Sequence, residues 1–311
     1  MLREYNKIQM RDAVIRKLYL EAKKNKNIIF ISNEQGAISL DKFRANLPDQ
    51  FINAGISEQN LISMAAGLAN TGKNVFVYSI ASFISLRCLE QIKLDLCVMK
   101  SPVKILGVGS GYSYAQDGPS HHSTEDFAIL NALPNIEFYS PSNSMIAEKL
   151  VEKLLILKKP AYVRLDRDVL YCSNKNFKLN EDFLVHNFKK KNTQQCTIIS
   201  TGVMSSKVLS IIKSLKKSIK LIDMIKLKPL NNMKLLKEIK GSKKIIVIEE
   251  HVSHGGLSSL IAQLIIELKE KIKFKKINLI EKSTFIYGSR DLIHKKNKML
   301  DKDIIKIINT I

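Results

Sequence analysis

Short β-branched segments alternate with longer amphipathic segments along most of this chain, and this alternation constrains its fold more than any other feature. In the first half, strands are expected at 27–32, 74–79, 103–107, 136–139 and 161–164. The segments between them with helical spacing of apolar residues are 10–24, 59–70, 88–99 and 143–158. Repeated strand–helix units of this kind predict an α/β fold, in which a mostly parallel sheet lies between layers of helices.

A second series of the same kind follows a change in composition after Arg167. Residues 173–192 are polar and basic, so we expect a linker there. Beyond it, strands are expected at 197–200, 219–223 and 244–249, and helices near 203–217 and 256–269. The 311 residues are therefore expected to form two domains, 1–172 and 193–311, each a mostly parallel sheet flanked by helices.

Composition argues against several classes of protein. The content of 45% hydrophobic and 25% charged residues is typical of a soluble globular protein. No run approaches the roughly 18 apolar residues that cross a bilayer. The first residues lack an apolar signal core, so we expect a cytoplasmic protein. The four cysteines have no metal-site or redox spacing and are expected to be buried thiols: Cys88, Cys97, Cys172 and Cys196.

The net charge of +21 raises the question of nucleic-acid binding. The lysines are spread along the chain in short runs such as 189–191, without zinc-finger spacing or an aromatic stacking signature. We therefore expect no nucleic-acid partner. The charge favours a solvated basic surface, or an attraction to phosphorylated or acidic partners.

The segment 53–60, Asn-Ala-Gly-Ile-Ser-Glu-Gln-Asn, places Glu58 at a junction between a strand and a helix of small residues. On its own, a glutamate there is most simply interpreted as a carboxylate that meets the positive end of the helix dipole. Held rigidly beside Gly55, it also suits proton transfer, which requires a carboxyl group of raised pKa in a dry pocket.

A second rigid segment, 117–122, reads Asp-Gly-Pro-Ser-His-His. The Gly-Pro pair marks a turn, and on that basis alone its histidines could be surface residues. Together and in this order, segments 53–60 and 117–122 resemble the pyrimidine-binding domain of the transketolase family of thiamine diphosphate enzymes. Segment 249–257, Glu-Glu-His-Val-Ser-His-Gly-Gly-Leu, resembles the family's C-terminal domain, where we expect His251 and His254 to be structural.

The resemblance implies roles for individual residues. The glutamate that matches Glu58 hydrogen-bonds the aminopyrimidine ring of the cofactor and promotes loss of a proton from the thiazolium carbon. The histidine that matches His121 faces the substrate and shuttles protons. The resemblance also implies that Asp117 binds a substrate hydroxyl, and that Arg167 and Arg11 bind the phosphate end of a sugar. On the residues alone, each arginine could equally form a surface salt bridge.

Segment 79–87 resembles the aromatic shelf beneath the pyrimidine ring. Phe83 is the expected stacking residue and Ile56 a further cofactor contact, although Phe83 could also be a core phenylalanine. The spacing from Phe83 to Glu90 differs by about one residue from the deoxyxylulose-phosphate synthase pattern, so Arg87 could occupy part of the shelf. A phosphate-binding histidine of transketolases is replaced by Gly109, which implies a different or bulkier sugar substrate.

The Gly-Asp-Gly signature that binds magnesium and the diphosphate in complete transketolases is missing from the sequence. The resemblance covers nearly all of this chain but only the second half of a complete transketolase. It implies the C-terminal subunit of a split transketolase, without metal ligands of its own. An N-terminal partner subunit would hold magnesium and the diphosphate, with two copies of each chain in a heterotetramer.

The implied reaction transfers a two-carbon ketol unit from a ketose to an aldose acceptor, with thiamine diphosphate and magnesium as cofactors. Three alternatives stay open. One is a deoxyxylulose-phosphate synthase-like enzyme that uses pyruvate, and another is a 2-oxo-acid dehydrogenase beta subunit, although its loop differs from Gly-Pro-Ser-His-His. The third is a non-catalytic scaffold that only pairs with a partner. The identities of the sugars and the pathway do not follow from the sequence.

Overall fold

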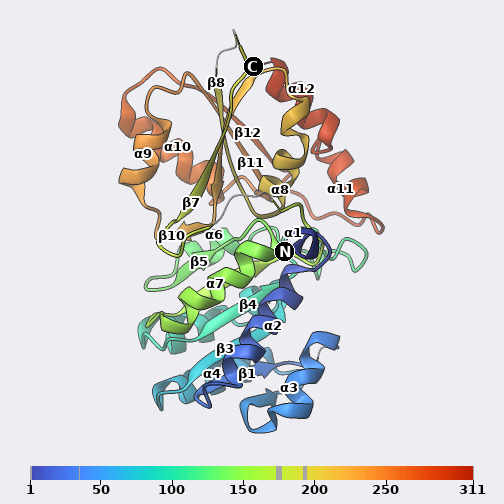
Figure 1. The fold of residues 1–311 in the computed structure, drawn as a ribbon, viewed down its shortest axis with the longest axis vertical. Coiled ribbons are helices and arrows are strands. Elements are labelled where there is room, and N and C mark those ends of the chain that lie inside the picture. The colour runs from blue at the N-terminus through green and yellow to red at the C-terminus, as the bar shows by residue number, and fades with distance from the viewer. Residues whose placement is uncertain (1, 35, 173–176, 192–194, 311) are drawn as a thin grey trace.

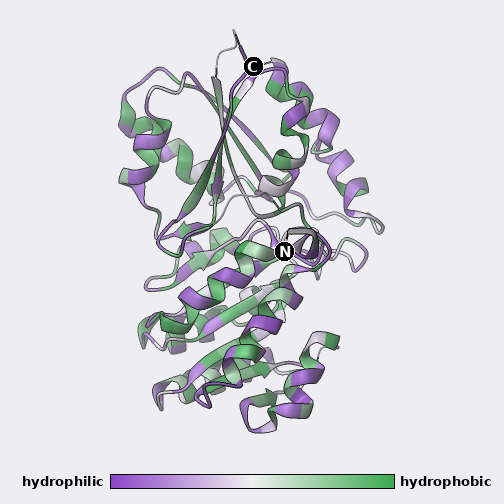
Figure 2. Cartoon of the chain, in the orientation of Figure 1, coloured by the Kyte–Doolittle hydropathy of each residue, from purple (hydrophilic) through white to green (hydrophobic). Residues whose placement is uncertain are grey.

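The structure, a computed structural model, describes residues 2–34, 36–172, 177–191 and 195–310. Two α/β units lie one above the other along the long axis of the molecule (Figure 1), as the alternating pattern predicts. Hydrophobic residues line the strands of both sheets, whereas hydrophilic residues lie mostly on the outer surfaces of the helices (Figure 2). Within the described ranges, no helix is both long enough and apolar enough to span a membrane.

The first sheet has seven strands in the order β10-β5-β6-β4-β3-β1-β2. They are β1 (Ile28–Ser32), β2 (Phe51–Asn53), β3 (Asn74–Ile80), β4 (Lys104–Val108), β5 (Glu137–Tyr139), β6 (Ala161–Leu165) and β10 (Lys226–Lys228). Every residue of β1, β4 and β6 is buried, because helices cover both faces of a parallel sheet. Strand β10 is antiparallel to β5 and comes from the second half of the chain, a crossover that the sequence pattern does not predict.

Helices on the two faces of this sheet enclose two hydrophobic cores. One core lies under α2 (Met10–Ala22) and α7 (Ser144–Ile156), and the other lies under α4 (Glu58–Asn70). The remaining helical segments of this half are α1 (Leu2–Tyr5), η1 (Ile38–Leu40), α3 (Asp41–Asn46), η2 (Pro48–Gln50), η3 (Phe83–Arg87), α5 (Leu89–Gln91), η4 (Ile92–Val98) and α6 (Asp126–Asn131).

The segment expected to form one helix over 88–99 is instead divided between α5 and the π-helical segment η4. A second π-helical segment, η3, precedes it at Phe83–Arg87. A π-helical turn accommodates one extra residue within a helix and is frequent at functional sites.

The second sheet has five strands in the order β12-β11-β8-β9-β7. They are β7 (Phe183–Phe188), β8 (Gln195–Thr201), β9 (Ser218–Met224), β11 (Lys244–Val252) and β12 (Lys273–Leu279). The flanking helices are α8 (Gly202–Ile211), η5 (Ile212–Ser214), α9 (Asn232–Ile239), α10 (Leu257–Leu268), α11 (Arg290–Lys296) and α12 (Asp301–Thr310). All pairs of strands are parallel except β7 with β9.

The prediction of a linker over 173–192 is wrong at residues 183–188, because these residues form edge strand β7. In β7, the buried side chains of Leu184 and His186 alternate with less buried neighbours. This alternation is short, and the segment is rich in lysine, so its composition indicated a linker and not a strand. Residues 173–176 and 192 of the expected linker lie outside the described residues.

Asp223 connects the two domains at the end of β9. Its carboxylate is fully buried and accepts a hydrogen bond of 2.6 Å from the hydroxyl of Ser142, in the first domain. Burial raises the pKa of Asp223 to about 6 from 3.8, although hydrogen bonds from Ser142 and Ser205 favour the charged form.

The substitution Asp223→Asn tests this buried carboxyl group. Because its pKa is higher in the folded than in the unfolded state, its contribution to stability is present at low pH and is lost as the pH rises through about 6. The difference between 3.8 and about 6 corresponds to about 3 kcal/mol. We expect urea unfolding to show that, as the pH falls from neutral to about 4, the free energy of unfolding of the wild type rises relative to that of the variant by up to this amount. If the two free energies of unfolding differed by the same amount across this pH range, the raised pKa of Asp223 would be contradicted.

Candidate active site

Glu58 is the first residue of α4, and only 5% of its side chain is exposed. The turn that precedes it requires Gly55, whose φ of +68° is unfavourable for other residues. Asn33 and Asn53 hold this turn, because the Asn33 amide donates to the Gly55 carbonyl and the Asn53 side chain accepts from the Gly55 N–H, both at 3.0 Å. The local sequence therefore fixes a buried carboxylate at the start of a helix.

Arg87 covers this carboxylate. Its Nη1 donates to Oε2 of Glu58 at 2.7 Å, and its guanidinium carbon lies 4.6 Å from the centroid of the Phe83 ring. The Phe83 ring also meets the His121 ring edge-on, with centroids 4.9 Å apart. Four residues from three separate segments thus form one line of contacts, and the π-helical segment η3 brings Phe83 and Arg87 into it.

The loop 117–122 is held against η3 by hydrogen bonds. The Ser82 hydroxyl donates to the carbonyl of Ser120 at 3.0 Å, and the His121 N–H donates to the Gly118 carbonyl at 3.0 Å. The Ser120 hydroxyl lies 3.0 Å from Nδ1 of His121. This contact occupies one ring nitrogen, so Nε2 is the nitrogen of His121 that can exchange a proton with a ligand.

Tyr114 joins this loop to the arginines predicted to bind substrate. The Arg167 guanidinium lies 4.3 Å from the centroid of the Tyr114 ring, and the His121 ring lies 5.8 Å from it. Arg167 also approaches Asp117 at 4.0 Å. Burial raises the pKa of the Tyr114 hydroxyl, and the charges of Arg167 and Arg11 oppose that rise. Both arginines therefore lie near one half-buried phenol.

A cavity of about 310 Å³ adjoins this group. It is lined by Gln9, Ser113, Ala115, Gln116, Asp117, Arg167, Asp168, Gly288, Ser289 and Arg290. Arg11 borders the cavity through Gln9, whose side-chain oxygen accepts from Nη2 of Arg11 at 2.9 Å. Arginine side chains beside a polar cavity of this size suit the anionic end of a small molecule.

Gly109 makes room for Tyr114. A Cβ atom at Gly109 would lie 2.1 Å from the Tyr114 ring, and the φ of +97° also disfavours a side chain. Tyr114 therefore fills the space that a side chain at Gly109 would occupy. No sequence pattern indicates Tyr114, because only the fold shows which side chain fills the space at Gly109.

The Glu-Glu-His segment at the end of β11 serves packing. Glu249 accepts from the N–H groups of Leu257 and Ser258 at 2.7 Å and so caps α10. Glu250 contacts Arg290 and His294. Burial opposes ionisation of Glu250, but the charge and hydrogen bonds of Arg290, with a smaller contribution from His294, hold its pKa well below its usual range.

The two histidines of this segment occupy different environments. His251 is buried, with Nδ1 2.7 Å from the Val252 carbonyl oxygen. His254 is exposed and pairs with Glu281 at 2.7 Å.

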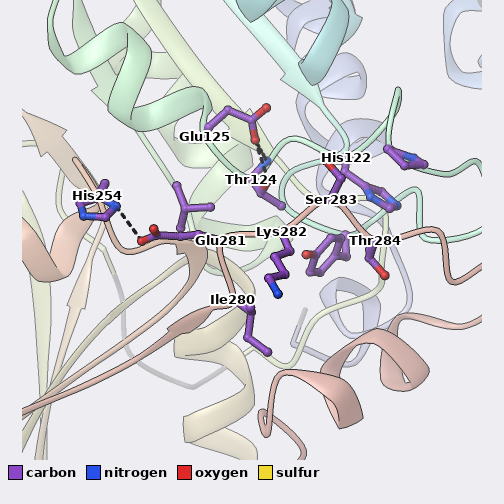
Figure 3. Close-up of a pocket in the computed structure, with 12 residues that line it drawn as sticks. His122, Thr124, Glu125, His254, Ile280, Glu281, Lys282, Ser283 and Thr284 are labelled. Carbon is purple, nitrogen blue, oxygen red and sulfur yellow. Dashed lines mark hydrogen bonds and ion pairs between the residues drawn. The ribbon is translucent and has the colours of Figure 1, made fainter.

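His254 and His122 line a second cavity, of about 390 Å³, between the domains (Figure 3). The His122 ring is buried and meets the Tyr112 ring edge-on, with centroids 4.8 Å apart. Burial lowers the pKa of His122, which makes it a poor proton donor at neutral pH. The two adjacent histidines of the loop therefore contact different surroundings, and only His121 lies beside Phe83.

The site fits one half of thiamine diphosphate. Glu58 offers a buried carboxylate, Phe83 offers a flat face on which a planar guanidinium already stacks, and Ile56 is 83% exposed beside them. A pyrimidine ring could use the same two contacts as Arg87. In contrast, the described part of the chain holds no group of three or more His, Cys, Asp or Glu side chains that could bind a metal ion.

Comparisons with known proteins identify the family. Residues 6–171 match the transketolase pyrimidine binding domain, and residues 187–286 match the transketolase C-terminal domain. The chain is 33% identical over 254 residues to an apulose-4-phosphate transketolase subunit of Phocaeicola vulgatus, covering 79% of this chain and 80% of that protein. It is 32% identical over 253 residues to a putative transketolase C-terminal section of Methanocaldococcus jannaschii, covering 78% of this chain and 77% of that protein.

A solved structure has a similar fold along its whole length. It is that of a split gene transketolase, an inactive beta4 tetramer, which superposes with a TM-score of 0.82 at 26% identity and covers 97% of this chain and 98% of that one. Both domain matches, the two relatives and this structure agree with the resemblance seen in the sequence. The chain therefore belongs to the transketolase family, in which it corresponds to the C-terminal half of a split transketolase.

Proposed function

We propose that this chain is the C-terminal subunit of a split, thiamine diphosphate-dependent transketolase of the cytoplasm. It would transfer a two-carbon ketol unit from a ketose to an aldose acceptor. The observation that carries the proposal is the line of contacts from buried Glu58 through Arg87 and Phe83 to His121. It unites a carboxylate, an aromatic face and an imidazole, which are the groups that this reaction requires from the half of the site held by this chain.

Glu58 and His121 have separate tasks in this proposal. When bound, thiamine diphosphate supplies the carbon nucleophile that attacks the ketose carbonyl. Glu58 shares a proton with a pyrimidine nitrogen from its buried position at the start of α4. His121 exchanges a proton with the substrate hydroxyl at Nε2, while Ser120 holds Nδ1. Phe83 provides the apolar surface on which the pyrimidine ring rests.

Asp117, Arg167 and Arg11 would hold the substrate itself. Asp117 and Arg167 line the cavity of about 310 Å³, and Arg11 borders it through Gln9. A guanidinium binds a phosphate or carboxylate with two parallel hydrogen bonds, so two arginines near one cavity favour a sugar with an anionic end. Asp117 accepts a hydrogen bond from a sugar hydroxyl beside it.

A partner subunit would complete the site. In this proposal the ligands of magnesium and the diphosphate come from another chain; among the described residues no group of three or more side chains could hold a metal ion. Apolar side chains next to Glu58 in the sequence and within η3 are exposed, among them Ile56 and Leu86, and a partner would cover them. The Phocaeicola vulgatus relative is itself named as one subunit of a transketolase. We propose a heterotetramer with two copies of each chain, by analogy with the closed symmetry of most oligomers.

The substitution Glu58→Gln tests the proposed chemistry. An amide cannot share the proton in the same way, so turnover of ketose donors by the assembled enzyme should fall by about a hundredfold or more. The fold should remain, because glutamine keeps the size of the side chain. The exposed residue Glu90 provides the matched control, and Glu90→Gln should leave turnover unchanged. Normal turnover by Glu58→Gln would remove Glu58 from the mechanism, and turnover of pyruvate instead of ketoses would favour the synthase alternative.

The substitution Arg87→Ala tests whether Arg87 must release Glu58 and Phe83 before the cofactor binds. Loss of a half-exposed ion pair and its cation–π contact should tighten cofactor binding to the assembled enzyme by about fivefold, as measured by calorimetry. Arg44→Ala is the matched control, because Arg44 also stacks on a phenylalanine, Phe51, and pairs with an acid, Asp41. Weaker binding by Arg87→Ala would mean that Arg87 contacts the bound cofactor.

A further inference from the structure

A cluster of buried charges joins the two domains beside the cavity near Arg167. Arg290 begins α11 in the second domain, and only 11% of its side chain is exposed. Its Nη1 and Nη2 donate to the two carboxylate oxygens of Asp166 at 3.0 and 2.8 Å, and Nη1 also donates to Asp168 at 2.7 Å. On its other edge, Nε donates to Glu250 at 2.8 Å, and Nη2 contacts the second oxygen of Glu250.

These contacts use every edge of the guanidinium. Arginine presents five N–H donors in one rigid plane, which no other side chain offers. Asp166 and Glu250 each accept a pair of hydrogen bonds from Arg290. Asp168 accepts one more. The positions of the three carboxylates are therefore fixed relative to one another, although Asp166 and Asp168 belong to the first domain and Glu250 to the second.

The cluster holds the backbone on both sides of Arg167. Asp166 and Asp168 flank Arg167 in the sequence, and both bind the same guanidinium. The Asp166 carboxylate also accepts from the Asp168 N–H at 2.8 Å. Between these two anchors, the Arg167 side chain extends over Tyr114 and borders the cavity.

The cluster also holds the start of the loop that leads to His121. Glu250 accepts from the N–H of Tyr112 at 3.0 Å. A Cβ atom at Gly111 would lie 1.9 Å from the Glu250 carboxylate, so the glycine permits this close approach. Ser110 donates to Asp166 at 3.1 Å. Residues 110–112 are thus bound at two points by side chains of the cluster.

We propose that Arg290 is a positioning residue for the substrate site, through which the second domain sets the place of Arg167 and thereby the affinity for the anionic end of the substrate. This inference rests on the proposed function, because there Arg167 is assigned to that end of the sugar. Gly288, Ser289 and Arg290 also line the cavity, so the second domain forms part of its wall. A buried ion cluster adds little net stability, which favours a role in geometry over one in stability.

The experiment uses the assembled enzyme and two variants of the cluster. Asp168→Asn removes the charge of the half-exposed carboxylate and leaves the paired bonds to Asp166 and Glu250, so the fold should persist. Arg290→Lys keeps the charge but loses the planar set of donors. Asp41→Asn is the matched control, an exposed aspartate that binds Arg44 at 2.8 Å far along the first domain.

Two readouts separate positioning from stability. Calorimetry with inorganic phosphate as the probe should show about tenfold weaker binding by Asp168→Asn and a larger loss by Arg290→Lys, with Asp41→Asn unchanged. Turnover should show a matching rise in KM for a phosphorylated ketose, with kcat within about twofold.

The outcomes distinguish this inference from the proposed function. Unchanged phosphate affinity in a folded Asp168→Asn variant, or no phosphate binding by the wild type, would overturn the role of Arg290. Should Arg290→Lys fail to fold, Asp168→Asn alone decides. A wild type that turns over no ketose, while phosphate binding still weakens in Asp168→Asn, would overturn the proposed function and support the positioning role.

Discussion

The contact between Glu58 and Arg87 is the interaction on which the rest of the site depends. A carboxylate that is only 5% exposed needs a charged or hydrogen-bonding partner, because burial of an unpaired charge costs several kcal/mol. In this chain Arg87 provides that partner, and Arg87 itself rests on Phe83. Because Phe83 contacts His121, the helix start, the π-helical segment η3 and the loop 117–122 form one connected unit. A planar ligand that replaces Arg87 would meet an already assembled half-site.

The sequence predicted the central strands well and the edge strands poorly, for a physical reason. Strands β1, β3 and β4 are buried on both faces, so their apolar runs stand out in the sequence. Edge strand β12 is half exposed and carries lysines on its open side, and edge strand β7 is a short alternation of buried and less buried residues within a lysine-rich segment, so in both the pattern is masked. Strand β10 has three residues and joins the sheet of the other domain, so only the tertiary fold reveals it.

Local motifs indicated the candidate residues of the site, whereas the contacts between those residues came from the fold. Glu58 and His121 lie in short segments with distinctive neighbours, and the structure brings both together with Phe83 and Arg87. Tyr114 and Arg290 were not predicted. The role of Arg290 follows from a contact with Asp166 across 124 residues of sequence, and no pattern within either segment indicates it.

A crystal structure of this chain assembled with its partner subunit and thiamine diphosphate tests the central claim most directly. In that structure we expect a pyrimidine nitrogen within hydrogen-bonding distance of the Glu58 carboxylate, the ring resting on Phe83, and Arg87 moved away from both. A structure in which Arg87 still binds Glu58 while the cofactor ring occupies another place would contradict it.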